Sequence, residues 1–582
     1  THYNRVAADD LAAYIEKISG IRPEIMEGTP EPLPARAVWV GYQPVLRQVF
    51  PALDFDFQHP EEILIAATDN HLALVGRDRW IEGHTEFVTS RSNAPGRQLE
   101  YGTVNAVYTF LQDYLGVRWL IPGPLGEDVP ELKQLAFEPF EYRYPPQIRA
   151  RSTLFAPWSP GSGRRNENFQ EWFRRQRLWL DSLDMHGGHA FTSWWEKYSE
   201  EHPDYFALQP DGQRSGYPGP RTVKICSANP AVWDRWLQEV EETLEADPTR
   251  RVFSAASNDG WSAGHCVCEA CRAWDHPEGE LLTYTWQGVS QDYVALSDRE
   301  VTFANTLARK LRERYPDKDY YVQVMAYGLS RPAPVGVAPD DNVIISSVAN
   351  FHLRPPAMRE VHISQFGDWG KKTQHLMWRP NLGNAFGWQW GMPDIALRQA
   401  GEDFRFVADN GAIGLFFDMI WDHWGNQGPH YYLIAHLAWN PYTDVDELMS
   451  DYYRRMYGPA APIMQGYWQE LERIRMEAVE AAESPLGIGE IYSPEVEARL
   501  EGMLDQSRQA LADAPGKYRE RLAFTRAGWD YAKVVIAIRR AMDRFEMSGN
   551  SDQEAAAEVL AYWDQVQNEM RGKIPDEVVS FM

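Results

Sequence analysis

Asparagine and aspartate stand side by side in the run Asn258-Asp259-Gly260, which follows the apolar stretch that begins at Val252. A carboxylic acid can protonate the leaving oxygen of a glycoside, and a neighbouring carboxamide can hold a substrate amide or hydroxyl. The same three residues also fit an Asn-Asp-Gly turn that simply closes a strand. We therefore predict Asp259 and Asn258 as catalytic residues, with the turn as the structural alternative.

A second acidic cluster lies later in the chain, where Asp418, Asp422 and His423 follow the apolar run at 414–417. Glycosidases usually use two carboxylates, about 5–5.5 Å apart in retaining enzymes and about 6.5–9.5 Å apart in inverting ones. Asp259 together with Asp418 or Asp422 could form such a pair. Capping of the next helix, or pairing with an arginine, is the alternative for these two acids.

Tryptophan is unusually frequent around both clusters. The chain has 23 tryptophans, and eleven of them gather in two groups: Trp158, Trp172, Trp179, Trp194 and Trp195, then Trp378, Trp388, Trp390, Trp421, Trp424 and Trp439. A single tryptophan is usually a core residue, but the flat faces of such rings also stack on sugars. Two groups in one segment therefore favour a carbohydrate cleft.

Polar residues in the same segment complete a candidate substrate site. His186-Gly-Gly-His189 could be a metal pair or a polar loop with one sugar-binding histidine, and the lack of acids at ligand spacing favours the loop. Arg379 could face a uronate carboxylate. We predict that substrate is bound by His189, Tyr327, Trp378, Arg379, Trp388, Trp390, Asp418, Trp421 and Asp422.

Three of the four cysteines crowd into Cys266-Val-Cys268-Glu-Ala-Cys271, and the fourth is Cys226. Four thiolates at this spacing can hold a tetrahedral zinc ion. Disulfides in an oxidising compartment are the alternative, although a Cys-x-Cys disulfide would be strained. In either case the cluster is expected to be structural and to fix the chain after Asp259. No cofactor is expected to take part in the chemistry.

Alternating strand and helix patterns predict the element that positions these residues. Strand-like runs at 222–226, 251–256, 320–326, 342–346 and 414–418 alternate with helical patterns over residues 144–443, which fits a (β/α)8 TIM barrel with catalytic groups at the carboxyl ends of its strands. A doubly wound sheet is the alternative, but no glycine fingerprint follows the first strand. A small α/β domain at 1–143 and an all-helical domain at 444–582 are expected to flank the barrel.

Length and charge limit the classes of function. A chain of 582 residues is too long to fold around a single hydrophobic core, so several domains are expected. Its 57 basic and 83 acidic residues give a net charge of −26. Such a surface repels nucleic acid and anionic membranes, and no apolar run is long enough to span a bilayer. We expect an oligosaccharide or polysaccharide as the partner, with neither nucleic acid nor a membrane span.

Several of these motifs resemble a known family, bacterial glycoside hydrolase family 163. The resemblance rests on Asn258-Asp259-Gly260 with the cysteine motif, on the runs 202–208 and 225–230, and on 437–441 through 457–460. The segment from Tyr101 to Pro122 is similar to the accessory domain that precedes the barrels of family 20 β-hexosaminidases and family 67 α-glucuronidases.

Family 163 contains endo-β-N-acetylglucosaminidases, so the resemblance implies a retaining mechanism in which the substrate's own 2-acetamido oxygen attacks. Carried over to this chain, Asn258 orients the acetamido group and Asp259 donates the proton. The family pattern has glutamate where this chain has Asp259, and the aspartate is shorter by one methylene.

The expected function is hydrolysis of a β-linked N-acetylhexosaminide by a secreted or periplasmic bacterial enzyme. One alternative is a two-carboxylate glycosidase for uronic acids or other polysaccharides. The other is a carbohydrate-binding relative that has lost catalysis.

Overall fold

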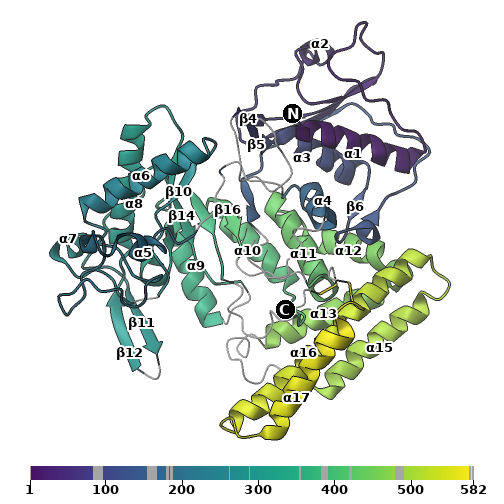
Figure 1. The fold of residues 1–582 in the computed structure, drawn as a ribbon. Coiled ribbons are helices and arrows are strands. Elements are labelled where there is room, and N and C mark those ends of the chain that lie inside the picture. The colour runs from purple at the N-terminus through teal and green to yellow at the C-terminus, as the bar shows by residue number, and fades with distance from the viewer. Residues whose placement is uncertain are drawn as a thin grey trace.

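The computed structural model of the chain describes most of its length (Figure 1). The described residues are 2–82, 96–153, 167–178, 183, 188–260, 263–286, 289–352, 356–381, 391–417, 423–478, 491–575 and 578–579. Among them, no helix has both the length and the apolar character that a membrane crossing requires.

A six-stranded, entirely parallel sheet forms the middle of the molecule (Figure 1). Its strands are β9 (Ala150–Thr153), β10 (Val252–Ser254), β13 (Tyr321–Ala326), β14 (Val343–Ser347), β15 (Leu376–Trp378) and β16 (Ala412–Phe416). All five residues of β14 are buried, as expected for a strand covered on both faces. The pairing order is β10-β13-β14-β15-β16-β9.

The strand order distinguishes between the two architectures that the sequence allowed, a β/α barrel and a doubly wound sheet. From β10 to β16 each strand pairs with the strand of this sheet that comes next in the chain, and the last, β16, pairs with the first, β9. A doubly wound sheet instead reverses its order at a switch point. On the other side of β10, His189 bridges Ala256 in parallel. The described strands therefore form part of a barrel wall, and closure by eight strands stays a prediction.

Helices lie between most of the parallel strands, as the alternating sequence pattern predicts, and one more follows the last strand. They are α4 (Glu167–Arg175), α5 (Trp194–Tyr198), α6 (Pro230–Ala246), α7 (Glu269–Arg272), α8 (Ser297–Arg314), α9 (Pro356–Gly370), α10 (Leu397–Asp409) and α11 (Trp424–Trp439). A hairpin of β11 (Leu281–Trp286) and β12 (Val289–Val294) lies between α7 and α8.

The N-terminal part contains a separate mixed sheet of order β1-β3-β2-β8. Its strands are β1 (Ala37–Val40), β2 (Ile63–Ala67), β3 (His71–Gly76) and β8 (Phe140–Tyr144); α1 (His2–Ser19) and α3 (Gly102–Thr109) lie close by (Figure 1). Smaller pairs are β4 (Asp78–Glu82) with β5 (Gly96–Tyr101) and β6 (Arg118–Trp119) with β7 (Glu127–Asp128).

A buried ion pair joins this N-terminal part to the parallel sheet. Glu61, which precedes β2, lies 2.8 Å from the guanidinium of Arg151 on β9, and both side chains are almost fully buried. Burial raises the pKa of Glu61 to about 7, although the charge of Arg151 acts in the opposite direction.

After residue 444 the described elements are helical. They are α12 (Val445–Tyr457), α13 (Ala461–Glu477), α15 (Pro494–Ala510), α16 (Gly516–Met547) and α17 (Gln553–Asp564). The long helix α16 crosses α11 at two glycines, where a Cβ on Gly528 would lie 2.5 Å from the carbonyl carbon of Gly425. Tyr531 of α16 stacks on His423, with ring centroids 6.3 Å apart, and leaves no room for a side chain at Gly391.

Candidate active site at the carboxyl ends of the parallel strands

Polar residues follow the carboxyl ends of adjacent strands in the parallel sheet. Asn258 and Asp259 come shortly after β10, Tyr327 directly after β13, Asn350 after β14 and Arg379 directly after β15. Carboxyl ends of parallel strands share one edge of a sheet, and this edge carries the active site in β/α barrels. The predicted residues Trp388, Trp390, Asp418, Trp421 and Asp422 lie outside the described residues.

Asp259 is an exposed carboxylate at this edge. Its Oδ1 accepts a hydrogen bond of 2.9 Å from the backbone N–H of Gly260, whose φ of +113° is a conformation suited to glycine. The backbone carbonyl of Asp259 accepts a second bond, 2.9 Å long, from the ammonium of Lys224. The carboxylate is therefore accessible to a ligand, while the hydrogen bond from Lys224 fixes the backbone of the same residue.

Asn258 has a different environment from the one we predicted. Its side chain is only 3% exposed. Its Oδ1 accepts from the backbone N–H of Phe191 at 3.1 Å, and its Nδ2 donates to the carbonyl of Val223 at 2.9 Å. The prediction that this amide orients a substrate group needs correction, because the amide is buried and ties together three chain segments.

His189 lies beside Asp259 and is held in one tautomer. Its Nδ1 lies 2.6 Å from the carbonyl oxygen of Ser257, which can only accept, so Nδ1 carries the proton and Nε2 is left as an acceptor. Burial lowers the pKa of His189 below its usual value; the charge of Asp259 opposes this shift, and that of Arg379 adds to it. A neutral histidine, an acid and an arginine thus lie close enough to interact electrostatically at this edge of the sheet.

Tyr327 and Arg379 occupy neighbouring positions on this edge. Tyr327 packs against Ala256 and Val348, which follow β10 and β14. The Arg379 guanidinium lies 4.8 Å above the ring centroid of Phe416 and donates a 3.1 Å hydrogen bond to Asn381. Both predicted residues therefore lie at the strand ends, and their contact with substrate stays a prediction.

Trp378 is not available as a sugar platform. It is fully buried, its indole N–H donates to the carbonyl of Ala349 at 3.0 Å, and its ring stacks on Phe351 at 4.7 Å. Its predicted role is wrong, because β15 directs this side chain into the core. Only the residue after it, Arg379, belongs to the exposed edge.

Two buried charged residues behind the loop of Asn258 and Asp259 were missed in the sequence. Lys224 donates to the backbone carbonyls of both Asn258 and Asp259, and burial lowers its pKa to about 8, with Glu300 and Asp259 opposing the shift. Burial raises the pKa of Glu300, and Lys224 opposes that shift. Both residues line a small cavity about the size of one water molecule. A lysine inside the apolar run Val223-Lys-Ile225 was the available signal.

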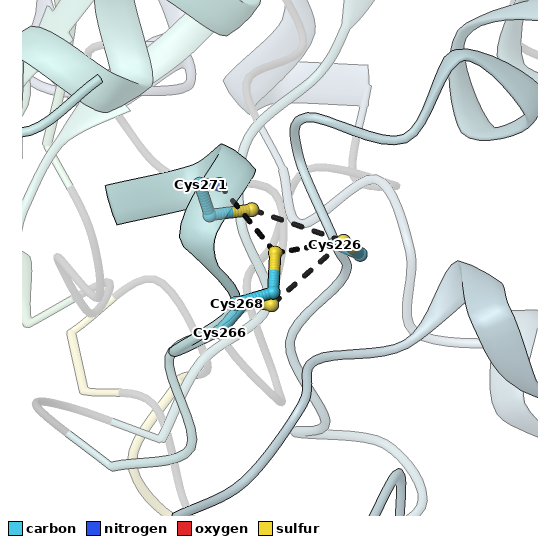
Figure 2. Close-up of side chains that lie close together, drawn as sticks. All are labelled: Cys226, Cys266, Cys268 and Cys271. Atoms are coloured by element: carbon cyan, nitrogen blue, oxygen red, sulfur yellow. Dashed lines mark hydrogen bonds between the residues drawn. The ribbon is translucent and has the colours of Figure 1, made fainter. Parts of the chain in front are cut away.

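The four cysteines come together in one cluster (Figure 2). All four are free thiols, and their Sγ atoms lie within 4.8 Å of one another. They are the residues that could hold a metal ion near the site.

Comparison with known proteins places the chain in a family. It belongs to the family described as "Domain of unknown function (DUF4838)", whose model matches residues 121–469. This span covers the parallel sheet and every residue of the candidate site. No curated protein matches the sequence at a significant level, and the resemblance to glycoside hydrolase family 163 stays a prediction.

Three solved structures follow a distantly similar chain course. "Structure of CpGH84D" has a TM-score of 0.42 at 12% identity, covering 99% of this chain and 93% of that chain. "Structure of CpGH84B" has a TM-score of 0.41 at 10% identity, covering 97% and 91%. A "GH138 enzyme targeting pectin rhamnogalacturonan II" has a TM-score of 0.36 at 9% identity, covering 97% and 72%. At these scores the likeness carries no inference about activity.

Proposed function

We propose that this protein is a glycoside hydrolase in which Asp259 is the general acid. The observation that carries the proposal is the position of Asp259, an exposed carboxylate at the carboxyl edge of a parallel sheet, on a loop whose backbone is fixed by Lys224. A proton donor must be both accessible and held in place. Asn258 supports it by anchoring the loop through two backbone bonds.

The finer proposal is a retaining, substrate-assisted cleavage of a β-linked N-acetylhexosaminide. The acetamido oxygen of the substrate attacks the anomeric carbon and the glycosidic C–O bond breaks while Asp259 protonates the departing oxygen, which leaves a cyclic oxazolinium ion that keeps the amide N–H. Water then opens this ring and gives its proton to the Asp259 carboxylate. Because Asn258 is engaged with the backbone, the task of holding the acetamido group falls in this proposal to Tyr327, on the next strand end.

Neighbouring polar groups have separate tasks in the same scheme. His189 offers Nε2 as an acceptor for a sugar hydroxyl, and Arg379 offers positively charged donors. Neither needs to exchange a proton with substrate. Both belong to binding and orientation, which can supply several kcal/mol of the reaction barrier.

A panel of glycans tests the class of enzyme and its substrate together. Purified protein is incubated with 2-acetamido, uronic-acid and neutral glycans, beside the Asp259→Asn variant prepared in the same way, so that a contaminating glycosidase is recognised by its activity in both samples. Release of product from 2-acetamido glycans alone supports the proposal. Cleavage of uronides supports a two-carboxylate enzyme, and binding without turnover supports a non-catalytic relative.

A thiazoline analogue tests the mechanism. It resembles the cyclised intermediate, and a site complementary to that species binds such mimics more tightly than substrate. Strong competitive inhibition is expected. An unaffected enzyme whose Asp418 or Asp422 variant is inactive and is rescued by azide would instead identify an enzyme carboxylate as the nucleophile.

A further inference from the structure

We propose that Cys226, Cys266, Cys268 and Cys271 bind one Zn²⁺ ion in a closed structural site. The four thiols come from two distant segments and face one another (Figure 2). Cys226 lies just before α6, while the other three lie in the chain that follows Asp259, at and before α7. The proposal does not depend on what the active site cleaves.

The spacing of the sulfur atoms matches a metal tetrahedron. Cys226 Sγ lies 3.7 Å from Cys266 Sγ, 3.7 Å from Cys268 Sγ and 3.8 Å from Cys271 Sγ. Four thiolates about 2.3 Å from a central zinc ion are separated from one another by about 3.8 Å. One cysteine is thus equally spaced from three others, which a disulfide pairing of the four does not require.

Backbone N–H groups point at the sulfur atoms, as they do where thiolates carry charge. Leu208 N–H donates to Cys266 Sγ at 3.2 Å, Ala228 N–H to Cys271 Sγ at 3.5 Å, and Cys271 N–H to Cys268 Sγ at 3.4 Å. Arg214 lies within hydrogen-bonding reach of Cys226. A zinc ion with four thiolates carries two negative charges, and these donors offset part of that charge.

Burial indicates that such a site is closed rather than catalytic. Three of the cysteines are buried, with exposed fractions of 4% for Cys226, 3% for Cys266 and 0% for Cys271; Cys268 is partly exposed. Catalytic zinc keeps a coordination position for water or substrate, and four protein ligands leave none. The ion would therefore act through the fold.

What the ion would hold is the loop that carries Asp259. Cys226 follows Lys224 by two residues, and Lys224 holds the carbonyls of Asn258 and Asp259. Cys266 is the first of the three cysteines that follow Asp259 in the chain. The metal would thus join the segment that contains Lys224 and Cys226 to the segment that follows Asp259. The loop that carries Asp259 would then be fixed on both sides.

Metal analysis of the purified full-length protein tests the proposal without any assay of activity. We expect about one equivalent of zinc per chain. When a mercurial reagent titrates the intact wild-type protein, about four thiols should react, and the amount of zinc released should rise in proportion to the thiols that have reacted. A chromogenic zinc indicator follows the release. This experiment needs no variant and so does not depend on whether a variant folds.

Matched variants then assign the ligands. Cys226→Ser and Cys271→Ser should each retain less than about one fifth of the zinc, whereas Ala270→Ser, an exposed change in α7 beside Cys271, should retain all of it. Four titratable thiols without metal, a mass that shows disulfides, or stoichiometric iron instead of zinc would each overturn the assignment.

Discussion

Asp259 and Asn258 are neighbours in sequence but have opposite environments, because one side chain points to solvent and the other into the protein. We expect Asp259→Asn to lower turnover about 100-fold or more, since the amide cannot supply the proton, while the melting temperature stays unchanged. Asp317→Asn, an exposed change in the turn before β13, is the control and should be fully active. Normal activity of the Asp259 variant would remove Asp259 from the mechanism.

Asn258→Ala distinguishes an anchoring role from a role in orienting substrate. The substitution leaves the N–H of Phe191 and the carbonyl of Val223 buried without this partner, so the free energy of unfolding should fall by about 1–3 kcal/mol. Urea unfolding measures the loss. A variant with wild-type stability and sharply reduced activity would instead show that the amide serves the substrate.

Residue types and spacing predicted the place of Asp259 after a strand end and the gathering of the cysteines, because both signals are local in sequence. They did not predict the burial of Trp378 or Asn258, which depends on the direction that a side chain takes from its strand end. Lys224 and Glu300 were missed for the same reason. Their proximity arises only when the chain before α6 and the start of α8 pack together.

At the scale of elements, the crossing of α11 and α16 depends on two glycines. A Cβ on Gly528 would lie 2.5 Å from the backbone of Gly425, so Gly528→Ala must push the helices apart, and we expect a loss of about 1–3 kcal/mol in stability. Gly502→Ala in α15 is a matched control, because nothing lies within 4 Å of its added Cβ. That change should stabilise by about 0.5–1 kcal/mol. Equal melting temperatures for both variants would contradict a tight crossing.

The starts of α6 and α8 show which structural features a local sequence pattern can predict. Asparagine followed by proline is a typical helix start, and at the start of α6 the Asn229 side chain accepts from the N–H of Ala231 at 3.0 Å, with Pro230 as the first helical residue. The run from Ser297 to Glu300 has the residue pattern of a capping box, but no side-chain hydrogen bond caps the start of α8. The Asp298 carboxylate instead accepts from the N–H groups of Val335, Gly336 and Val337, in a loop that is distant in sequence.

At the scale of the whole molecule, Glu61 should make stability depend on pH. Its pKa of about 7 in the folded protein exceeds its usual value, so the folded state holds this proton more tightly than the unfolded state. The stabilising contribution is complete below about pH 4.5 and is lost as the pH rises to about 7, by up to about 3 kcal/mol. Glu61→Gln lacks this dependence.

Urea unfolding of both proteins between pH 4.5 and 8 isolates the effect, because other titrating groups cancel in the difference. The wild type should lose stability relative to Glu61→Gln as the pH rises. A constant difference would mean that Arg151 keeps Glu61 ionised throughout.

The whole fold was only partly predictable. Alternating patterns predicted parallel strands and a helical C-terminal part, since periodicity reports which faces are buried. The pairing of β16 with β9 joins segments about 260 residues apart, and no local pattern specifies it.

The contact of Tyr531 with Gly391 and His423 has a consequence for how the family is delimited. Those two residues directly follow the ranges 382–390 and 418–422, which contain five of the nine predicted substrate-binding residues. The family match, however, ends at residue 469. The structural unit of this protein therefore extends past the matched span, because α16 packs on residues that lie inside that span.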